Sequence, residues 1–210
     1  MSAPLKVINL GLPKSGTTTL GEALKRAGLR VADWRIRRGQ DGPLRRFVGD
    51  LMYQSYFDNG DPLAQLGGFD AFTEIEIVRN DLNLWPQTDW ALISAIRERH
   101  PGSRFLLNTR DPAAISASMQ RWSNLGKRRL PGSSVPGLPI PYGSTDAERV
   151  RWIEGHFKFC RKVFENSDDF LEFDIADPEA PKLISDFLGI DLPWWGVANA
   201  NPAEPAEDVS

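Results

Sequence analysis

The stretch that decides the fold runs from Leu5 to Ala27 and reads "LKVINLGLPKSGTTTLGEALKRA". It opens with a short apolar run typical of a buried strand, continues through a loop of small residues, and then takes on helical periodicity. The helix is expected because four apolar residues recur on one face: Leu20, Ala23, Leu24 and Ala27. Gly28 follows as a natural helix stop, so the stretch predicts a strand, a glycine-rich loop and a helix in direct succession.

The loop "GLPKSGTT", Gly11 to Thr18, has the chemistry of an anion-binding site. A glycine-rich turn between a strand and a helix directs several backbone N–H groups at one point, and the positive end of the helix dipole reinforces them. Lys14 adds a full positive charge, and three hydroxyl donors come from Ser15, Thr17 and Thr18. The loop therefore predicts a phosphate-like ligand.

The position of the lysine separates two kinds of phosphate loop. Nucleotide triphosphatases follow the pattern G-x-x-x-x-G-K-[ST], in which the lysine reaches the terminal phosphates and the Ser or Thr holds Mg²⁺. Gly11 and Gly16 keep that spacing, but Thr17 occupies the lysine position. Asp174, at the end of "FLEFD", is the nearest candidate for a second Mg²⁺ ligand and comes late in the chain. A metal-dependent kinase of nucleotides or small molecules is therefore the weaker of the two interpretations.

Composition indicates an ordinary soluble enzyme-sized domain. The chain has 210 residues, of which 41% are hydrophobic and 25% charged, so it is long enough to bury a sizeable core. A net charge of −3 gives no argument for nucleic acid or an anionic membrane as a partner. The single cysteine, the absence of a signal-peptide pattern and the lack of a bilayer-length apolar run predict a cytoplasmic protein.

Strand and helix patterns alternate along the chain and predict an α/β fold. Strands are expected over residues 4–12, 29–34, 71–78, 104–110 and 169–175, and helices over 15–27, 43–58, 88–102, 111–122, 146–166 and 178–190. This alternation favours a three-layer architecture of the P-loop kinase type, with a parallel sheet of about four to five strands between helices. We expect one domain over residues 1–200, a flexible lid loop around 124–145 and a frayed tail over 201–210.

The order of residues in "LPKSGTT" resembles the 5′-phosphosulfate loop of sulfotransferases that use 3′-phosphoadenosine 5′-phosphosulfate (PAPS). The second signature of that family is an arginine at a strand end with a serine eight residues later, matched here by Arg110 and Ser118. The segments "GFDA" and "LPWWGVANANP" are also similar to small bacterial members, so the resemblance covers roughly residues 5 to 201. It implies donor contacts from Pro13, Lys14, Ser15, Gly16, Thr17, Thr18, Arg110 and Ser118.

The resemblance also implies a reaction, in which a sulfuryl group moves in line to a hydroxyl or amine of a small-molecule or carbohydrate acceptor. Lys14 would stabilise the bridging oxygen as it becomes charged, and the product nucleotide would be 3′,5′-diphosphoadenosine (PAP), with no metal required. Family members use a histidine or carboxylate as base near the second or third strand, which favours Glu74 first and Asp33 second. A solvated edge strand is the alternative explanation of Glu74 and Glu76.

Three questions stay open on the sequence alone. A member of the family that binds nucleotide without turnover remains an alternative to an enzyme. His156 lies in the middle of a predicted helix, where a packed histidine is favoured over a role at the site. The basic run of residues 127–129 fits either a solvated surface or a lid that closes over PAPS.

Overall fold

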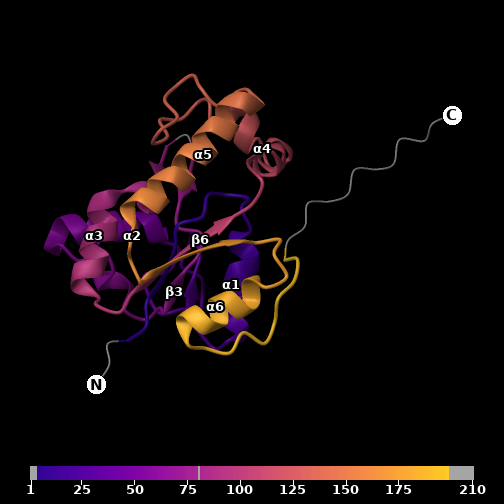
Figure 1. The fold of residues 1–210 in the computed structure, drawn as a ribbon. Coiled ribbons are helices and arrows are strands. Elements are labelled where there is room, and N and C mark those ends of the chain that lie inside the picture. Colours follow the sequence, from indigo (N-terminus) through magenta and orange to yellow (C-terminus); the bar gives the residue numbers. More distant parts are fainter. Residues whose placement is uncertain (1–3, 80, 199–210) are drawn as a thin grey trace.

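The computed structural model describes residues 4–79 and 81–198, and these form an α/β fold around one central sheet (Figure 1). Its five strands are all parallel and run in the order β2-β3-β1-β6-β7. Their bounds are β1 Val7–Asn9, β2 Val31–Ala32, β3 Ala71–Phe72, β6 Arg104–Thr109 and β7 Phe170–Asp174. The predicted fold class and the parallel sheet are confirmed.

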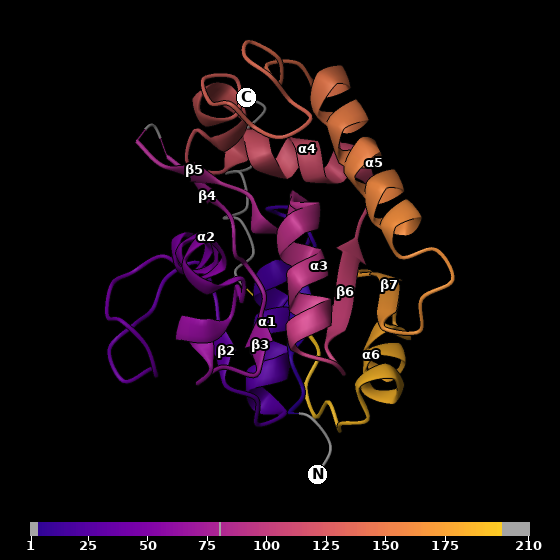
Figure 2. The ribbon, with the colours of Figure 1, turned by 90° about the vertical axis from the view of Figure 1, so that its left-hand side faces the viewer.

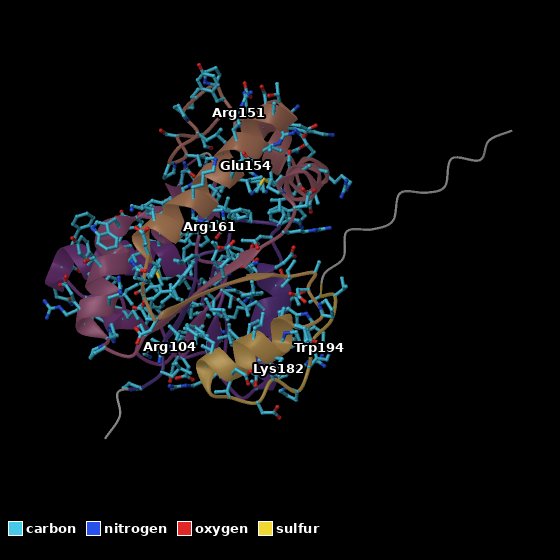
Figure 3. The ribbon with its side chains drawn as sticks, in the orientation of Figure 1. Arg104, Arg151, Glu154, Arg161, Lys182 and Trp194 are labelled. Atoms are coloured by element: carbon cyan, nitrogen blue, oxygen red, sulfur yellow. The ribbon has the colours of Figure 1, made fainter. Side chains whose placement is uncertain are left out.

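The described residues form six α-helices, and together with the central sheet they make a three-layer arrangement. Their bounds are α1 Thr17–Arg26, α2 Val48–Asn59, α3 Trp90–Arg99, α4 Pro112–Arg121, α5 Asp146–Val163 and α6 Ala180–Leu188. In Figure 1, α1 and α6 lie on one side of the sheet while α2 and α3 lie on the other, and Figure 2 shows α4 and α5 at the upper end. Figure 3 shows Arg151, Glu154 and Arg161 along the outer side of α5, where all three are exposed.

The period-two alternation of the strands builds a separate core on each face of the sheet. Val7 and Leu106 pack with α1 and α6, whereas Ile8, Phe105 and Leu107 pack with the helices of the opposite layer. Adjacent strand residues therefore point to opposite faces, as a sheet covered on both sides requires. All five of these side chains are buried, with at most 1% of their surface exposed.

Side-chain caps fix where several helices begin. The Asp89 carboxylate accepts a hydrogen bond from Ala91 N at the start of α3, and Asp111 accepts one from Ala114 N at the start of α4. Thr145 and Glu148 form a reciprocal capping box at the start of α5. Asp111 caps α4 and Pro112 occupies its first turn, so α4 begins directly after β6, as the helix predicted over residues 111–122 requires.

The prediction of one strand over residues 71–78 is wrong. The chain pairs with β1 and β2 only over β3, leaves the sheet after Thr73, and then forms a separate antiparallel hairpin. The strands of this hairpin are β4 Ile77–Val78 and β5 Asn83–Leu84. The predicted alternation also fails here, because Ile75 and Glu76 are both buried, and residues 74–76 belong to no strand. Glu74 consequently lies just beyond the end of a strand rather than inside one.

Residues 124–145 form a connection with a buried apolar side. A π-helical turn over Leu125–Arg129 follows α4, and four residues of the connection join the larger core: Leu125, Leu130, Val135 and Leu138. Its motion as a lid stays a prediction. The predicted tail over 201–210 lies outside the described residues, and among the described residues no helix combines the length and apolarity needed to cross a bilayer.

Candidate functional site

A cavity of about 1,070 Å³ lies at the carboxyl edge of the central sheet. Because all five strands are parallel, the segments that follow them meet at this edge. The cavity is lined from the loop after β1, the turn after β2, residues 74–79, the β6–α4 junction, the end of α4, the π-helical turn over Leu125–Arg129, the turn after β7 and residues 195–198. Eight segments of the described chain therefore converge on one space.

The glycine loop forms one wall of this cavity, and its backbone is strongly turned. Lys14 has φ of 69° and Gly16 has φ of 106°, both in the left-handed region. A side chain at Gly16 would also place its Cβ 2.5 Å from Cγ1 of Ile175, so only glycine fits there. Helix α1 begins at Thr17, and its N-terminus faces the cavity together with Pro13. This arrangement of turned backbone and helix N-terminus suits an anion.

Ser15 does not line the cavity, although it belongs to the loop. It is fully buried, and its hydroxyl donates to the carbonyl of Leu12 at 2.6 Å. The Asn108 amide on β6 donates to both the carbonyl and the hydroxyl oxygen of Ser15, each at 2.8 Å. The expectation that the Ser15 hydroxyl contacts a ligand is therefore not met in this structure, because that hydroxyl holds the loop to β6.

The second predicted pair lies on the same cavity. Arg110 directly follows β6 and is exposed, while Ser118 lies two turns into α4 and is buried. Both residues line the cavity, as do Lys14 and Thr18 of the loop. The loop and the Arg110–Ser118 pair are thus held in one frame, since Asn108 ties the loop to the strand that carries Arg110.

Lys14 sits in a partly buried, electrostatically mixed setting. Its ammonium lies 5.0 Å from the ring centroid of Trp122. Burial lowers the pKa of Lys14, Glu74 opposes that change, and the positive charges of Arg110 and Arg121 reinforce it. The Lys14 ammonium therefore interacts electrostatically with one carboxylate, which favours its charged form, and with two guanidinium groups, which disfavour it.

Two carboxyl groups from the segment after β3 line the cavity. Burial, followed by the charge of Asp33, raises the pKa of Glu74, while Lys14 acts in the opposite direction. Burial, followed by the charge of Glu74, raises the pKa of Glu76 to about 8. Only 6% of Glu76 is exposed, and its Oε2 accepts a hydrogen bond from Gln87 Nε2 at 3.0 Å. The alternative of a solvated edge strand is wrong for this segment.

Asp33 also reaches the cavity, but its carboxylate is already occupied. One oxygen accepts a hydrogen bond from the backbone N–H of Arg35 at 3.2 Å, and the other pairs with the guanidinium of Arg37.

Across residues 4–79 and 81–198, no three Asp, Glu, His or Cys side chains come together as metal ligands.

Several residues of the cavity wall were missed by the sequence-based reasoning. Arg121 and Trp122 follow Ser118 at helical spacings of three and four, so the α4 face did carry a usable signal. Arg129 was considered only as part of a basic run. No local pattern places residues 195–198 in the cavity wall. Their position depends on a contact between residues far apart in the sequence, since Ala198 N donates to the Thr19 hydroxyl at 3.2 Å.

His156 is a packing residue of α5. Its Nε2 lies 2.7 Å from the carbonyl oxygen of Leu10, and only 6% of the residue is exposed. Burial lowers the pKa of His156 to about 4. It borders a separate cavity of about 720 Å³ between α5 and residues 136–142. The prediction of a packed histidine agrees with this geometry.

Comparison with known proteins identifies one family. A family model described as "Sulfotransferase domain" matches residues 6–130. A mouse sulfotransferase, SULT7A1, solved in complex with PAP, is 16% identical with a TM-score of 0.45, and the match covers 90% of this chain and 61% of that one. A sulfotransferase from Alicyclobacillus acidocaldarius is 15% identical with a TM-score of 0.47, covering 95% and 87% respectively.

The chain thus spans about 61% of the length of the mouse protein. No protein in the search of curated sequences matches it.

Proposed function

Because this chain belongs to the sulfotransferase family, we propose that it transfers a sulfuryl group from PAPS to a hydroxyl or amine of a small-molecule or carbohydrate acceptor. The observation that carries the proposal is the convergence of two anion-binding elements on one cavity. The loop around Lys14 forms one element, and Arg110 with Ser118 forms the other. A nucleotide with phosphate groups at both its 5′ and 3′ positions needs two such elements in a fixed frame.

The residues present fit such a donor. The N-terminus of α1, the Lys14 ammonium and the hydroxyl groups of Thr17 and Thr18 would hold the 5′ side. Arg110 and Ser118 would hold the 3′-phosphate, as the resemblance implied. Ser15 would contribute indirectly, by keeping the loop attached to Asn108. When bound, PAPS supplies the sulfuryl group, and the loop determines where that group lies.

The transfer breaks one bond to sulfur as it forms another. The acceptor oxygen or nitrogen forms the new bond to sulfur, the bond between sulfur and the phosphate oxygen breaks, and the acceptor proton goes to a base. Lys14 stabilises the negative charge that builds on the departing phosphate oxygen. Lys14 borders the same cavity as Glu74 and interacts with it electrostatically. One cavity therefore holds both the group that stabilises the leaving phosphate oxygen and the group that would accept the proton of the acceptor.

Glu74 is the best candidate for the base. It lines the cavity, it interacts electrostatically with Lys14, and burial raises its pKa, which makes its carboxylate a stronger proton acceptor once ionised. Asp33 is the second candidate, but its carboxylate already pairs with the guanidinium of Arg37. We therefore assign proton removal to Glu74 and positioning of the Arg37 side chain to Asp33.

A metal-dependent kinase is the competing function. Thr17 occupies the position where a kinase loop places its lysine. Asp174, the candidate Mg²⁺ ligand, is exposed, and its Oδ1 accepts a hydrogen bond from Ala176 N at 2.8 Å. Both features favour the sulfotransferase.

A thermal-shift comparison tests the two functions. We expect PAP to raise the melting temperature of the protein more than ATP with Mg²⁺ at equal concentration. Stabilisation by ATP with Mg²⁺ and none by PAP would overturn the proposal. Stabilisation by PAP without sulfation of any acceptor in a broad library would instead support a non-catalytic nucleotide-binding protein.

We further propose that this single domain acts in the cytoplasm.

A further inference from the structure

Arg129 lines the cavity, and its guanidinium has an unusual set of hydrogen bonds. Its Nη1 donates to the carbonyl oxygen of Val78 at 3.1 Å, which fixes the guanidinium in place. Its Nε and Nη2 atoms are buried, and no acceptor among the described residues lies within hydrogen-bonding distance of either. Burial also lowers the pKa of Arg129. Leaving two charged donors without a partner is costly, so this edge needs an explanation.

Other arginines of this chain indicate what the Nε–Nη2 edge binds. Arg30 uses it to hold Asp70 at 2.9 and 2.7 Å, and Arg161 uses it to hold Glu172 at 2.7 and 2.5 Å. Arg97 uses the same edge for Asp169 at 2.8 and 3.3 Å. The two parallel donors of this edge match the two oxygens of a carboxylate. The corresponding edge of Arg129 therefore has the geometry of a carboxylate site.

The position of Arg129 associates it with the acceptor rather than the donor phosphates. Its bond to Val78 attaches it to the segment of residues 74–79, which carries Glu74. The Trp122 ring centroid lies 5.0 Å from Arg129 Cζ and also 5.0 Å from Lys14 Nζ, so one aromatic ring packs beside both side chains. Two further arginines on this side of the cavity are already paired, Arg37 with Asp33 and Arg79 with Asp81.

We propose that Arg129 binds a carboxylate of the acceptor through its Nε–Nη2 edge, so that the acceptors of this protein are hydroxy or amino acids in the chemical sense. This inference rests on the proposed function, because it assumes that the Glu74 side of the cavity receives the acceptor. Trp122 supports the site by packing against the guanidinium. The hydroxyl or amine would then lie toward Glu74 and Lys14, while the carboxylate lies against Arg129.

Matched pairs of compounds test the proposal without requiring turnover. Binding of 4-hydroxyphenylacetate and 4-hydroxyphenylacetamide, and of glucuronate and glucuronamide, is measured by calorimetry on protein saturated with PAP. We expect at least one carboxylate to bind about 10- to 100-fold more tightly than its amide, as a charge-assisted bidentate contact warrants. Arg129→Gln is expected to remove this preference, and Arg129→Lys to keep only part of it.

Arg128→Gln provides the matched control, because Arg128 is the exposed neighbour on the same turn. The preference must survive in that variant. Absence of any carboxylate preference in the unmodified protein, or a preference that persists in Arg129→Gln, overturns the proposal. A tenfold loss of PAP affinity in Arg129→Gln would assign the edge to the donor and also overturn it. If PAP fails to bind, the proposed function fails separately, and the pairs are compared without PAP.

Discussion

Replacement of Glu76 by glutamine should make the protein more stable at high pH and leave it nearly unchanged at low pH. Glu76 is buried beside the cavity, and burial together with the charge of Glu74 raises its pKa from 4.5 to about 8. A folded state with the higher pKa holds its proton more tightly than the unfolded chain does. The contribution of Glu76 to stability is therefore fully present below pH 4.5 and is lost as pH rises to about 8.

The size of the effect follows from the same two values. Each pH unit between them corresponds to about 1.36 kcal/mol, so ionising Glu76 in the folded protein lowers the free energy of unfolding by about 3–5 kcal/mol. Glutamine has nearly the same shape and carries no charge. Its amide can accept the hydrogen bond from Gln87 Nε2 and donate to Gln87 Oε1, which has no donor among the described residues.

Urea unfolding of both proteins between pH 4.5 and pH 9 measures the difference. We expect the curves to agree near pH 4.5 and Glu76→Gln to be more stable by a few kcal/mol at pH 9. Glu154→Gln is a control at an exposed carboxylate, because Glu154 lies on the outer side of α5 (Figure 3). Equal stability of the unmodified protein and Glu76→Gln at pH 9 would refute the reasoning, since it would mean that Glu76 ionises at little cost.

Three further substitutions test the site. Glu74→Gln should lower kcat about 10²–10⁴-fold while the Kd for PAP stays unchanged, measured by steady-state kinetics and calorimetry, and an unaltered kcat would remove Glu74 as the base. Lys14→Ala should lower kcat about 10²–10³-fold with little change in the acceptor KM, and a raised KM with an unchanged kcat would indicate a binding role only. Asn108→Leu should weaken PAP binding and lower unfolding free energy by about 1–3 kcal/mol, because both bonds to Ser15 are lost; unchanged PAP affinity would show that the loop keeps its shape alone.

The sequence predicted those parts of the molecule that depend on local patterns. The glycine loop and the offset from Arg110 to Ser118 both follow from short-range spacing, and the structure brings them to one cavity. Helix periodicity was equally informative, because each α-helix buries one set of its residues. The parallel sheet followed from the alternation of elements.

What the sequence could not predict depends on contacts between distant residues. The chain leaves the sheet after Thr73, and the alternation of residues 74–78 gives no sign of it. Ser15 has the hydroxyl of a ligand donor, but Asn108, far along the chain, determines where that hydroxyl points. In the sequence, Arg129 is only one member of a charged run. Its distinct position depends on the hydrogen bond from its guanidinium to the carbonyl of Val78, which is distant in the sequence.

The most direct test of the account is the contribution of the 3′-phosphate to nucleotide affinity. Calorimetric titration with PAP and with adenosine 5′-monophosphate compares two ligands that differ only in that group. We predict that PAP binds about 10- to 100-fold more tightly, and that Arg110→Gln brings the two affinities together. Equal affinities in the unmodified protein, or a preference for PAP that survives in Arg110→Gln, would contradict the account.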